Sequence, residues 1–226
     1  HMPRETIEMF ELINLHNSWS LIWRGCVDAP ELGYFNDVAL KGDGSFFTTH
    51  MYERGLSLLS MLYISFTKPD TGFVYQWDAG DGFTKVPNSD GSFPNGISIS
   101  DDEEDLFINY VFNHRTSKLN LENLNIEAEH FSKGTPDNSS IDGDYIWVAT
   151  QDNTGIDLLM HCDETVVQCS LPFTIYKLRQ SDLSEVASFS FSQTQMGSVT
   201  VAVTHKDKVW LGTFHGDRMA SFDNTN

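Results

Sequence analysis

The sequence is poor in basic residues and has no long hydrophobic run. It contains 14 lysines and arginines against 32 aspartates and glutamates, so the formal net charge of the 226 residues is −18. A field of this sign repels nucleic acid and anionic membrane surfaces and attracts cations. The longest apolar stretch, Leu56 to Phe66, is shorter than the roughly 20 residues of a membrane-spanning helix. The sequence therefore predicts neither a nucleic-acid partner nor a membrane span.

Cysteine is also scarce. Cys26, Cys162 and Cys169 form no CxxC pair and have no zinc-type spacing to histidine, so no zinc site is predicted. The odd count gives no disulfide framework, and we interpret His161 beside Cys162 as structural or incidental. The cysteine count does not decide the cellular compartment, and a soluble, secreted or periplasmic location is favoured over a cytoplasmic one. There is no GxSxG motif, and no cysteine has an evident base partner, so no covalent nucleophile is expected.

Helical patterns are nearly absent, and Tyr52 to Ile64 is the best helical candidate. Short segments rich in β-branched and aromatic residues dominate instead, separated by Gly, Asp, Asn or Pro. Such punctuation is typical of an antiparallel all-β protein.

An internal repeat makes the fold prediction more specific. Tyr34 to His50, Ser92 to Tyr110 and Thr135 to Thr150 share one order: an Asx residue, a short strand, an acidic or glycine turn, and an aromatic strand. Gly197 to Gly216 keeps the strand pair but places Ser198 where the others have Asx. The copies lie roughly 40 to 60 residues apart, close to the length of a four-stranded blade. The sequence predicts a β-propeller of four-stranded antiparallel blades.

The repeated Asx residues indicate a metal site. Innermost propeller strands line a central channel, so Asn36, Asn95 and Asp137 are expected to converge there. Their oxygens suit Ca²⁺, which takes six to eight oxygen ligands. The competing interpretation is that each Asx only caps a turn. Gly96 is expected to let the backbone turn sharply into the inner strand.

The motifs "NDVAL" at Asn36, "FPNGISIS" at Phe93, "PDNSSIDGDYIWVA" at Pro136 and "GSVTVAVTHKDKVWLGTFH" near the end occur in one order. Together they resemble the paraoxonase/arylesterase-type calcium lactonases, within the wider superfamily of gluconolactonases and strictosidine-synthase-like proteins. The likeness covers almost the whole chain.

This resemblance implies a six-bladed β-propeller with a catalytic and a structural calcium in its tunnel. The implied activity is calcium-dependent hydrolysis of lactones, aryl esters or both, with calcium polarising the carbonyl and water as the nucleophile. The implied roles are catalytic-calcium ligation by Asn36, Asn95, Asp137 and Asn138, structural-calcium ligation by Asp37, a pocket wall at Phe93, and water activation at His1. His50, at the end of a second strand, is a further candidate for contact with the substrate.

The chain also departs from that pattern. The family's propeller is longer than 226 residues, and its first-blade acidic calcium ligand has no counterpart here. Three complete blades are expected, from Tyr34 to about Asn88, Phe93 to about Phe131 and Thr135 to about Phe191, within one domain (1–226) that is incomplete at its N-terminus. The outlying strands could pair into a closing blade, or self-association or a second chain could complete the ring, because open sheet edges invite pairing.

Two other functions stay open. A non-catalytic, calcium-stabilised propeller would act as a binding scaffold. A strictosidine-synthase-like scaffold would hold no metal at all. Because Asp137 is the one acid among the four catalytic ligands, weak calcium binding is expected.

Overall fold

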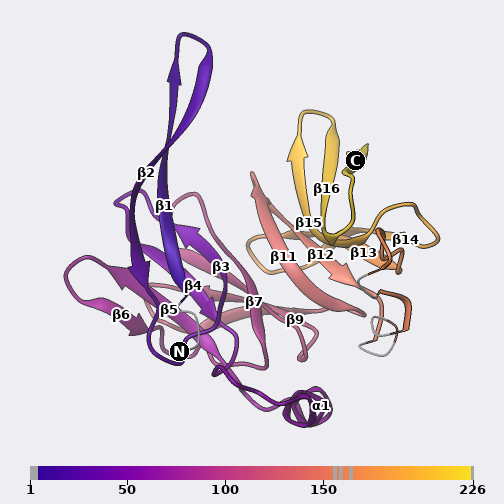
Figure 1. Cartoon of the computed structure of the whole chain (residues 1–226), viewed down its shortest axis with the longest axis horizontal. Coiled ribbons are helices and arrows are strands. Elements are labelled where there is room, and N and C mark those ends of the chain that lie inside the picture. Colours follow the sequence, from indigo (N-terminus) through magenta and orange to yellow (C-terminus); the bar gives the residue numbers. More distant parts are fainter. Residues whose placement is uncertain (1–4, 155–156, 158–159, 163–164, 225–226) are drawn as a thin grey trace.

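The computed structural model describes every residue except 1–4, 155–156, 158–159, 163–164 and 225–226 (Figure 1). Its strands are β1 (Thr6–Leu15), β2 (Ser18–Asp28), β3 (Phe35–Leu40), β4 (Phe46–His50), β5 (Phe73–Asp78), β6 (Gly82–Lys85), β7 (Pro94–Ile99), β8 (Asp105–Tyr110), β9 (Arg115–Asn120), β10 (Ile126–Phe131), β11 (Thr135–Asp142), β12 (Tyr145–Gln151), β13 (Phe173–Arg179), β14 (Glu185–Phe191), β15 (Ser198–His205), β16 (Lys208–His215) and β17 (Ala220–Asp223). The prediction of an all-β fold is confirmed.

The strands form blades in chain order. Sheets β3–β6, β7–β10 and β11–β14 are four-stranded and antiparallel, and β15–β17 is a three-stranded sheet of the same kind. The first strands of successive sheets contact one another, β3 with β7, β7 with β11 and β11 with β15. First strands are therefore innermost, as in a β-propeller. The three complete blades expected from the sequence are confirmed.

Hydrophobic residues are buried where one blade meets the next. Phe47 of β4 shares a core with Leu106 of β8, and Phe107 of β8 shares another with Ile146 of β12. Trp147 of β12 packs in a third core with Val209 of β16. Because alternate residues of β8 and β12 serve different cores, each of these strands is buried on both faces. This face-to-face packing fixes the inner strands that carry the site.

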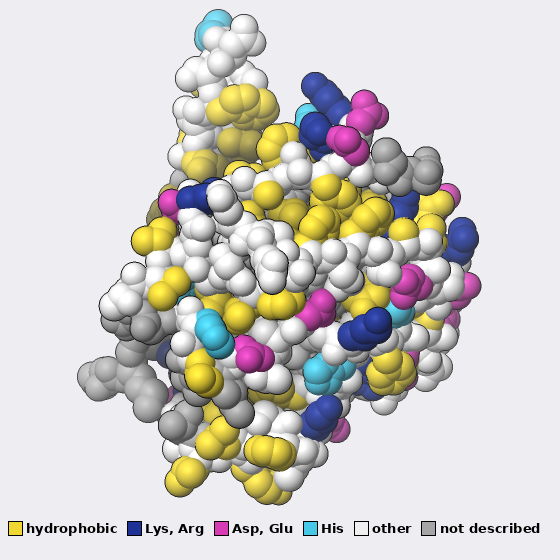
Figure 2. Space-filling view, turned by 90° about the vertical axis from the view of Figure 1, so that its right-hand side faces the viewer, with side chains coloured by type: hydrophobic (Ala, Val, Ile, Leu, Met, Phe, Trp, Pro, Cys, Tyr) yellow, Lys and Arg dark blue, Asp and Glu magenta, His cyan; other side chains and the backbone are white. Residues whose placement is uncertain are grey.

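The ribbon formed by β1 and β2 stands apart from the blades and projects from the body (Figure 1). The alternative in which the first and last strands pair into one closing blade does not hold for the described residues, since β1–β2 and β15–β17 form separate sheets. Cross-strand pairing places Phe10 opposite Trp23 and Leu12 opposite Leu21. These four residues and Trp19 form an apolar ribbon face. The exposed fraction of its residues ranges from 56% at Phe10 to 68% at Leu21. Figure 2 shows hydrophobic side chains gathered on this projection.

Among the elements that the structure describes, α1 (Leu58–Thr67) is the helix. It overlaps the predicted helical segment, Tyr52 to Ile64, but begins six residues later. Ser57 sets the start, because its side chain accepts a hydrogen bond from the backbone N–H of Ser60. Lys68 ends the helix in a left-handed conformation at φ 50°. Within the described part of the chain, no helix is long and apolar enough to cross a membrane.

Candidate functional site

The predicted metal-ligating residues lie where the first strand of each complete blade departs from regular pairing. The register of β3 with β4 shifts between Phe35 and Val38, that of β7 with β8 between Pro94 and Ile97, and that of β11 with β12 between Pro136 and Ser139. The residues skipped in these irregularities are Asn36, Asp37, Asn95, Gly96, Asp137 and Asn138. Such bulges redirect side chains out of the sheet, so three blades present their Asx residues to one place.

That place is a cavity of about 580 Å³. Of the predicted site residues, Asn36, Phe93, Asn95, Asp137 and Asn138 line it. The other lining residues are Val111, Phe112, Thr135, Pro136, Gln151, Asn153, Thr200 and Phe214. The cavity therefore combines amide and carboxylate oxygens with an aromatic wall.

Asp137 is the acid of the cavity. Its Oδ2 accepts a hydrogen bond of 2.8 Å from Nε2 of Gln151, and its Oδ1 accepts one of 3.1 Å from Nδ2 of Asn138. Burial, with a smaller contribution from the negative charge of Asp37, raises the pKa of Asp137 to about 7. Hydrogen bonds from Gln151 and Asn95 act in the opposite direction. A nearby cation would favour the ionised carboxylate.

Asn95 contributes an unsatisfied acceptor. Its Oδ1 is buried and has no hydrogen-bond donor among the described residues. Its backbone is held in place, because Oγ1 of Thr49 donates a hydrogen bond of 2.5 Å to the carbonyl oxygen of Asn95. A buried oxygen without a donor is costly unless a ligand satisfies it.

Gly96 allows two inner strands to approach closely. A Cβ atom at this position would lie 2.3 Å from the carbonyl oxygen of Asp137 and 2.6 Å from Cα of Asn138. Gly96 lies inside strand β7 and is not among the glycines with positive φ, so a sharp turn that uses the left-handed conformation of glycine is not present there. The glycine is needed for space between β7 and β11.

Asp37 lies beside the cavity and joins two blades. Its Oδ2 accepts a hydrogen bond of 2.9 Å from the backbone N–H of Ile97 in the next blade, and its Oδ1 accepts one of 2.8 Å from Val38. Burial raises the pKa of Asp37. The carboxylate thus fixes β7 against β3 next to the candidate metal ligands.

His50 is buried, with 5% of its surface exposed. Its Nδ1 accepts a hydrogen bond of 3.2 Å from the backbone N–H of Tyr34, and its ring packs against Phe73 and Tyr75. Burial lowers the pKa of His50 and favours the neutral ring. It is not among the described residues that line the cavity. This placement favours a packing role, and contact with a substrate stays a prediction.

Phe93 forms part of the aromatic wall. Its ring lies 4.8 Å from that of Tyr52 and 5.0 Å from that of Phe112, measured between ring centroids. Its backbone φ is 61°, an uncommon value for a bulky residue. The N–H of Phe93 donates to Oγ1 of Thr71, which helps to hold this conformation. His1, the predicted water-activating residue, lies outside the described residues.

The residues present fit a calcium ion better than a transition metal. No group of three or more His, Cys, Asp or Glu side chains that could hold a metal occurs in the described ranges. Hard oxygen donors are available instead from Asn36, Asn95, Asp137 and Asn138, and oxygen donors are what Ca²⁺ prefers. The unsatisfied Oδ1 of Asn95 supports this fit.

Several cavity residues escape sequence reasoning. Gln151 is the last residue of β12 and Asn153 lies two residues beyond it. Pairing of Thr135 with Gln151 brings this end of β12 beside the start of β11. The sequence feature that could have indicated them is the run of polar residues, Gln151 to Thr154, directly after "WVAT". In the fourth blade Thr200 lines the cavity, whereas Ser198, aligned with the Asx residues from sequence, is buried elsewhere.

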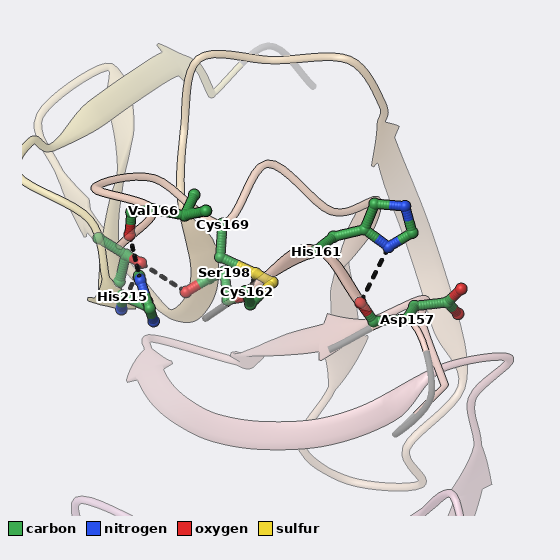
Figure 3. The surroundings of a disulfide bond; sticks show 8 residues. Asp157, His161, Cys162, Val166, Cys169, Ser198 and His215 are labelled. Carbon is green, nitrogen blue, oxygen red and sulfur yellow. Dashed lines mark hydrogen bonds between the residues drawn. A yellow bond between two sulfur atoms is a disulfide. The ribbon is translucent and has the colours of Figure 1, made fainter. Parts of the chain in front are cut away.

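A disulfide joins Cys162 to Cys169 in the connection between β12 and β13 (Figure 3). No pattern in the sequence pairs these two cysteines, and Cys26 is a free cysteine. Ser198 donates a hydrogen bond of 3.2 Å to Sγ of Cys169, and Nε2 of His215 lies 2.6 Å from the carbonyl oxygen of Val166. These contacts fasten the connection to the fourth blade.

A family model described as the SMP-30/gluconolactonase/LRE-like region matches residues 8–177. The match covers most of the chain, including every described site residue named above except Thr200 and Phe214. The chain belongs to this family. No curated protein matches it.

Solved structures share the fold. A luciferin-regenerating enzyme superposes with a TM-score of 0.54 at 16% identity, covering 91% of this chain and 64% of that one. A Bacteroides caccae protein of unknown function gives 0.54 at 10% identity, with 95% and 74% covered. Kuenenia stuttgartiensis hydrazine synthase gives 0.52 at 14% identity, with 80% and 42% covered. The chain thus spans 64% of the luciferin-regenerating enzyme's length.

Proposed function

We propose that this protein is a calcium-dependent hydrolase of lactones, aryl esters or both, of the paraoxonase/arylesterase type. The observation that carries the proposal is the convergence of Asp137 and the unsatisfied Oδ1 of Asn95 on one cavity. Membership of a family that includes gluconolactonases supports hydrolysis of a cyclic ester. The aromatic wall at Phe93 and Phe112 supports an apolar acyl or aryl group on the substrate.

Asn36, Asn95, Asp137 and Asn138 would hold the catalytic ion. Nδ2 of Asn138 donates hydrogen bonds to Oδ1 of Asp137 and to the carbonyl oxygen of Thr200, so Oδ1 of Asn138 is the atom available for ligation. When bound, calcium supplies Lewis-acid polarisation of the carbonyl. Asp37 is our candidate ligand for a structural calcium, through carboxylate lone pairs that its two backbone donors leave unused.

The protein's own groups bind and orient the ester. Phe93 and Phe112 exclude water from one side of the cavity, so the carbonyl is directed toward the polar side. Hydrolysis forms a bond between water oxygen and carbonyl carbon and breaks the ester C–O bond. One proton passes from the water to the departing alkoxide or phenoxide. His1 is our candidate to move that proton, and His50 is a candidate contact for the substrate.

The test is hydrolysis of δ-valerolactone and of phenyl acetate, measured with added calcium and with EDTA. We expect hydrolysis that EDTA abolishes, and a loss of calcium binding by calorimetry in Asn95→Ala and Asp137→Ala. Asn123→Ala, in an exposed turn between β9 and β10, is the matched control.

A folded sample that hydrolyses neither substrate would overturn the enzyme proposal. If calcium still raised its melting temperature, the result would favour the binding scaffold. If such a sample hydrolysed neither substrate and its melting temperature did not respond to calcium or EDTA, the result would favour a scaffold without metal.

A further inference from the structure

Asn153 presents a second unsatisfied polar atom to the same cavity. Its side-chain Nδ2 is buried and has no hydrogen-bond acceptor among the described residues. Asn153 lines the cavity together with Asn95 and Asp137. A buried donor without a partner costs roughly 1 to 3 kcal/mol. Such a group persists where a bound molecule supplies the missing partner.

The chain around Asn153 is held on both sides. The backbone N–H of Asp152 donates a hydrogen bond of 3.0 Å to Pro172, and the Asp152 carboxylate accepts one of 2.5 Å from Oγ1 of Thr174. On the other side, Thr154 donates from its backbone N–H to Asp157 at 2.8 Å. Asn153 is therefore placed by its neighbours, as a preorganised binding group must be.

The two unsatisfied atoms have opposite hydrogen-bonding character. Oδ1 of Asn95 is an acceptor and attracts positive charge, whereas Nδ2 of Asn153 is a donor and attracts negative charge. One ligand arrangement satisfies both, namely a cation with a carbonyl oxygen bound beside it. A cavity that bound a metal ion alone would leave the Asn153 donor unpaired.

We propose that Asn153 is a substrate-binding residue whose Nδ2 donates a hydrogen bond to the carbonyl oxygen of the ester or lactone. This inference rests on the proposed function. As water adds to the carbonyl carbon, the C=O π pair moves onto that oxygen, and the hydrogen bond strengthens as the charge develops. When the ester C–O bond breaks, the charge returns to the carbonyl bond and the donor is released.

The experiment compares Asn153→Ala and Asn153→Asp with the wild type and with the Asn123→Ala control. We expect kcat/KM for phenyl acetate to fall on the order of 10²-fold in Asn153→Ala, as for other lost oxyanion donors. Calcium affinity should stay within about twofold of the wild type, since the amide N–H does not ligate the ion. The melting temperature should stay equal or rise, because an unpaired buried donor has been removed.

A binding measurement separates this inference from the proposed function. Phenyl methylphosphonate, an anionic mimic of the tetrahedral intermediate of phenyl acetate hydrolysis, is titrated by calorimetry in the presence of calcium. We expect about tenfold weaker binding to Asn153→Ala and a further loss in Asn153→Asp, whose carboxylate repels the anion. If the wild type hydrolyses nothing but binds the phosphonate through Asn153, the proposed function fails and the binding role stands.

Three outcomes would overturn the assignment. The first is hydrolysis by Asn153→Ala at the wild-type rate. The second is phosphonate binding that is unchanged in Asn153→Ala. The third is a fall in calcium affinity that matches the fall in activity in Asn153→Ala, with recovery of calcium binding in Asn153→Asp, which would make Asn153 a metal ligand.

Discussion

Nε2 of Gln151 lies 2.8 Å from Oδ2 of Asp137, so two adjacent strands of the third blade together hold one buried carboxylate at the cavity. The two side chains come together because β11 and β12 are antiparallel, so the start of β11 lies beside the end of β12. The carboxylate titrates far from its ordinary range, since burial raises the pKa of Asp137 to about 7.

This shift predicts how pH affects the calcium-free protein. The folded state holds a proton on Asp137 up to about pH 7, whereas the unfolded chain releases it near the ordinary value of 3.8. The folded state therefore binds more protons between these values, and this contribution to stability is lost as pH rises from about 4 to about 7. Urea unfolding in EDTA at several pH values measures the trend.

Asp137→Asn is the control for that trend, because it keeps the shape of the side chain and cannot titrate. We expect its stability to depend less steeply on pH than that of the wild type. Equal slopes for both proteins would show that other groups cause the pH dependence.

The close approach of β7 to β11 predicts a cost for Gly96→Ala. The new Cβ would lie 2.3 Å from the carbonyl oxygen of Asp137, and backbone cannot move aside cheaply. We expect a loss of about 2 kcal/mol in the free energy of unfolding. Calcium affinity should fall as well, because Asp137 must shift.

Gly42→Ala is the matched substitution for Gly96→Ala. Its Cβ would meet the end of the Glu103 side chain at 3.3 Å, and that side chain can move. A similar loss of stability in both variants would contradict the role assigned to Gly96.

The Cys162–Cys169 disulfide predicts sensitivity to reducing agents. Opening the loop of seven-residue separation should lower the free energy of unfolding by about 2 kcal/mol. Cys26 is exposed and free, so Cys26→Ser should leave the response to reductant unchanged. Alkylation followed by mass spectrometry should label one thiol before reduction and three after. Three labelled thiols without reductant would disprove the pairing.

The apolar ribbon face predicts self-association of this chain. Five large apolar side chains on one face of a two-stranded ribbon are more than half exposed, and such patches mark contact surfaces. We expect Trp19→Thr combined with Leu21→Thr to reduce association in analytical ultracentrifugation. Ser18→Thr with Ser20→Thr, on the opposite face, should not. A wild-type chain that stays monomeric at all concentrations would refute the prediction.

The blades and most of the site were readable from sequence. Alternating strands and polar turns are local patterns, and their repetition along the chain predicts Phe93 to about Phe131 as one blade. The repeated Asx residues pointed to one channel because each opens the first strand of its blade. Asn36, Asn95 and Asp137 do line a common cavity.

Other features depended on contacts between distant residues. Gly96 was expected to turn the chain, yet its role is to admit Asp137 from the next blade, which no local pattern records. Cys162 and Cys169 pair within one connection, and Ser198 of the distant fourth blade donates a hydrogen bond to Cys169.

The sequence by itself thus determined an antiparallel propeller, since hydrophobic periodicity and turn residues act over short distances. It also identified the Asn and Asp residues at the start of the first strand of each complete blade. Only the tertiary structure decided which atoms of those residues remain unsatisfied. Oδ1 of Asn95 and Nδ2 of Asn153 acquire that property from the packing of separate blades, because burial and loss of hydrogen-bond partners arise only when distant strands come together.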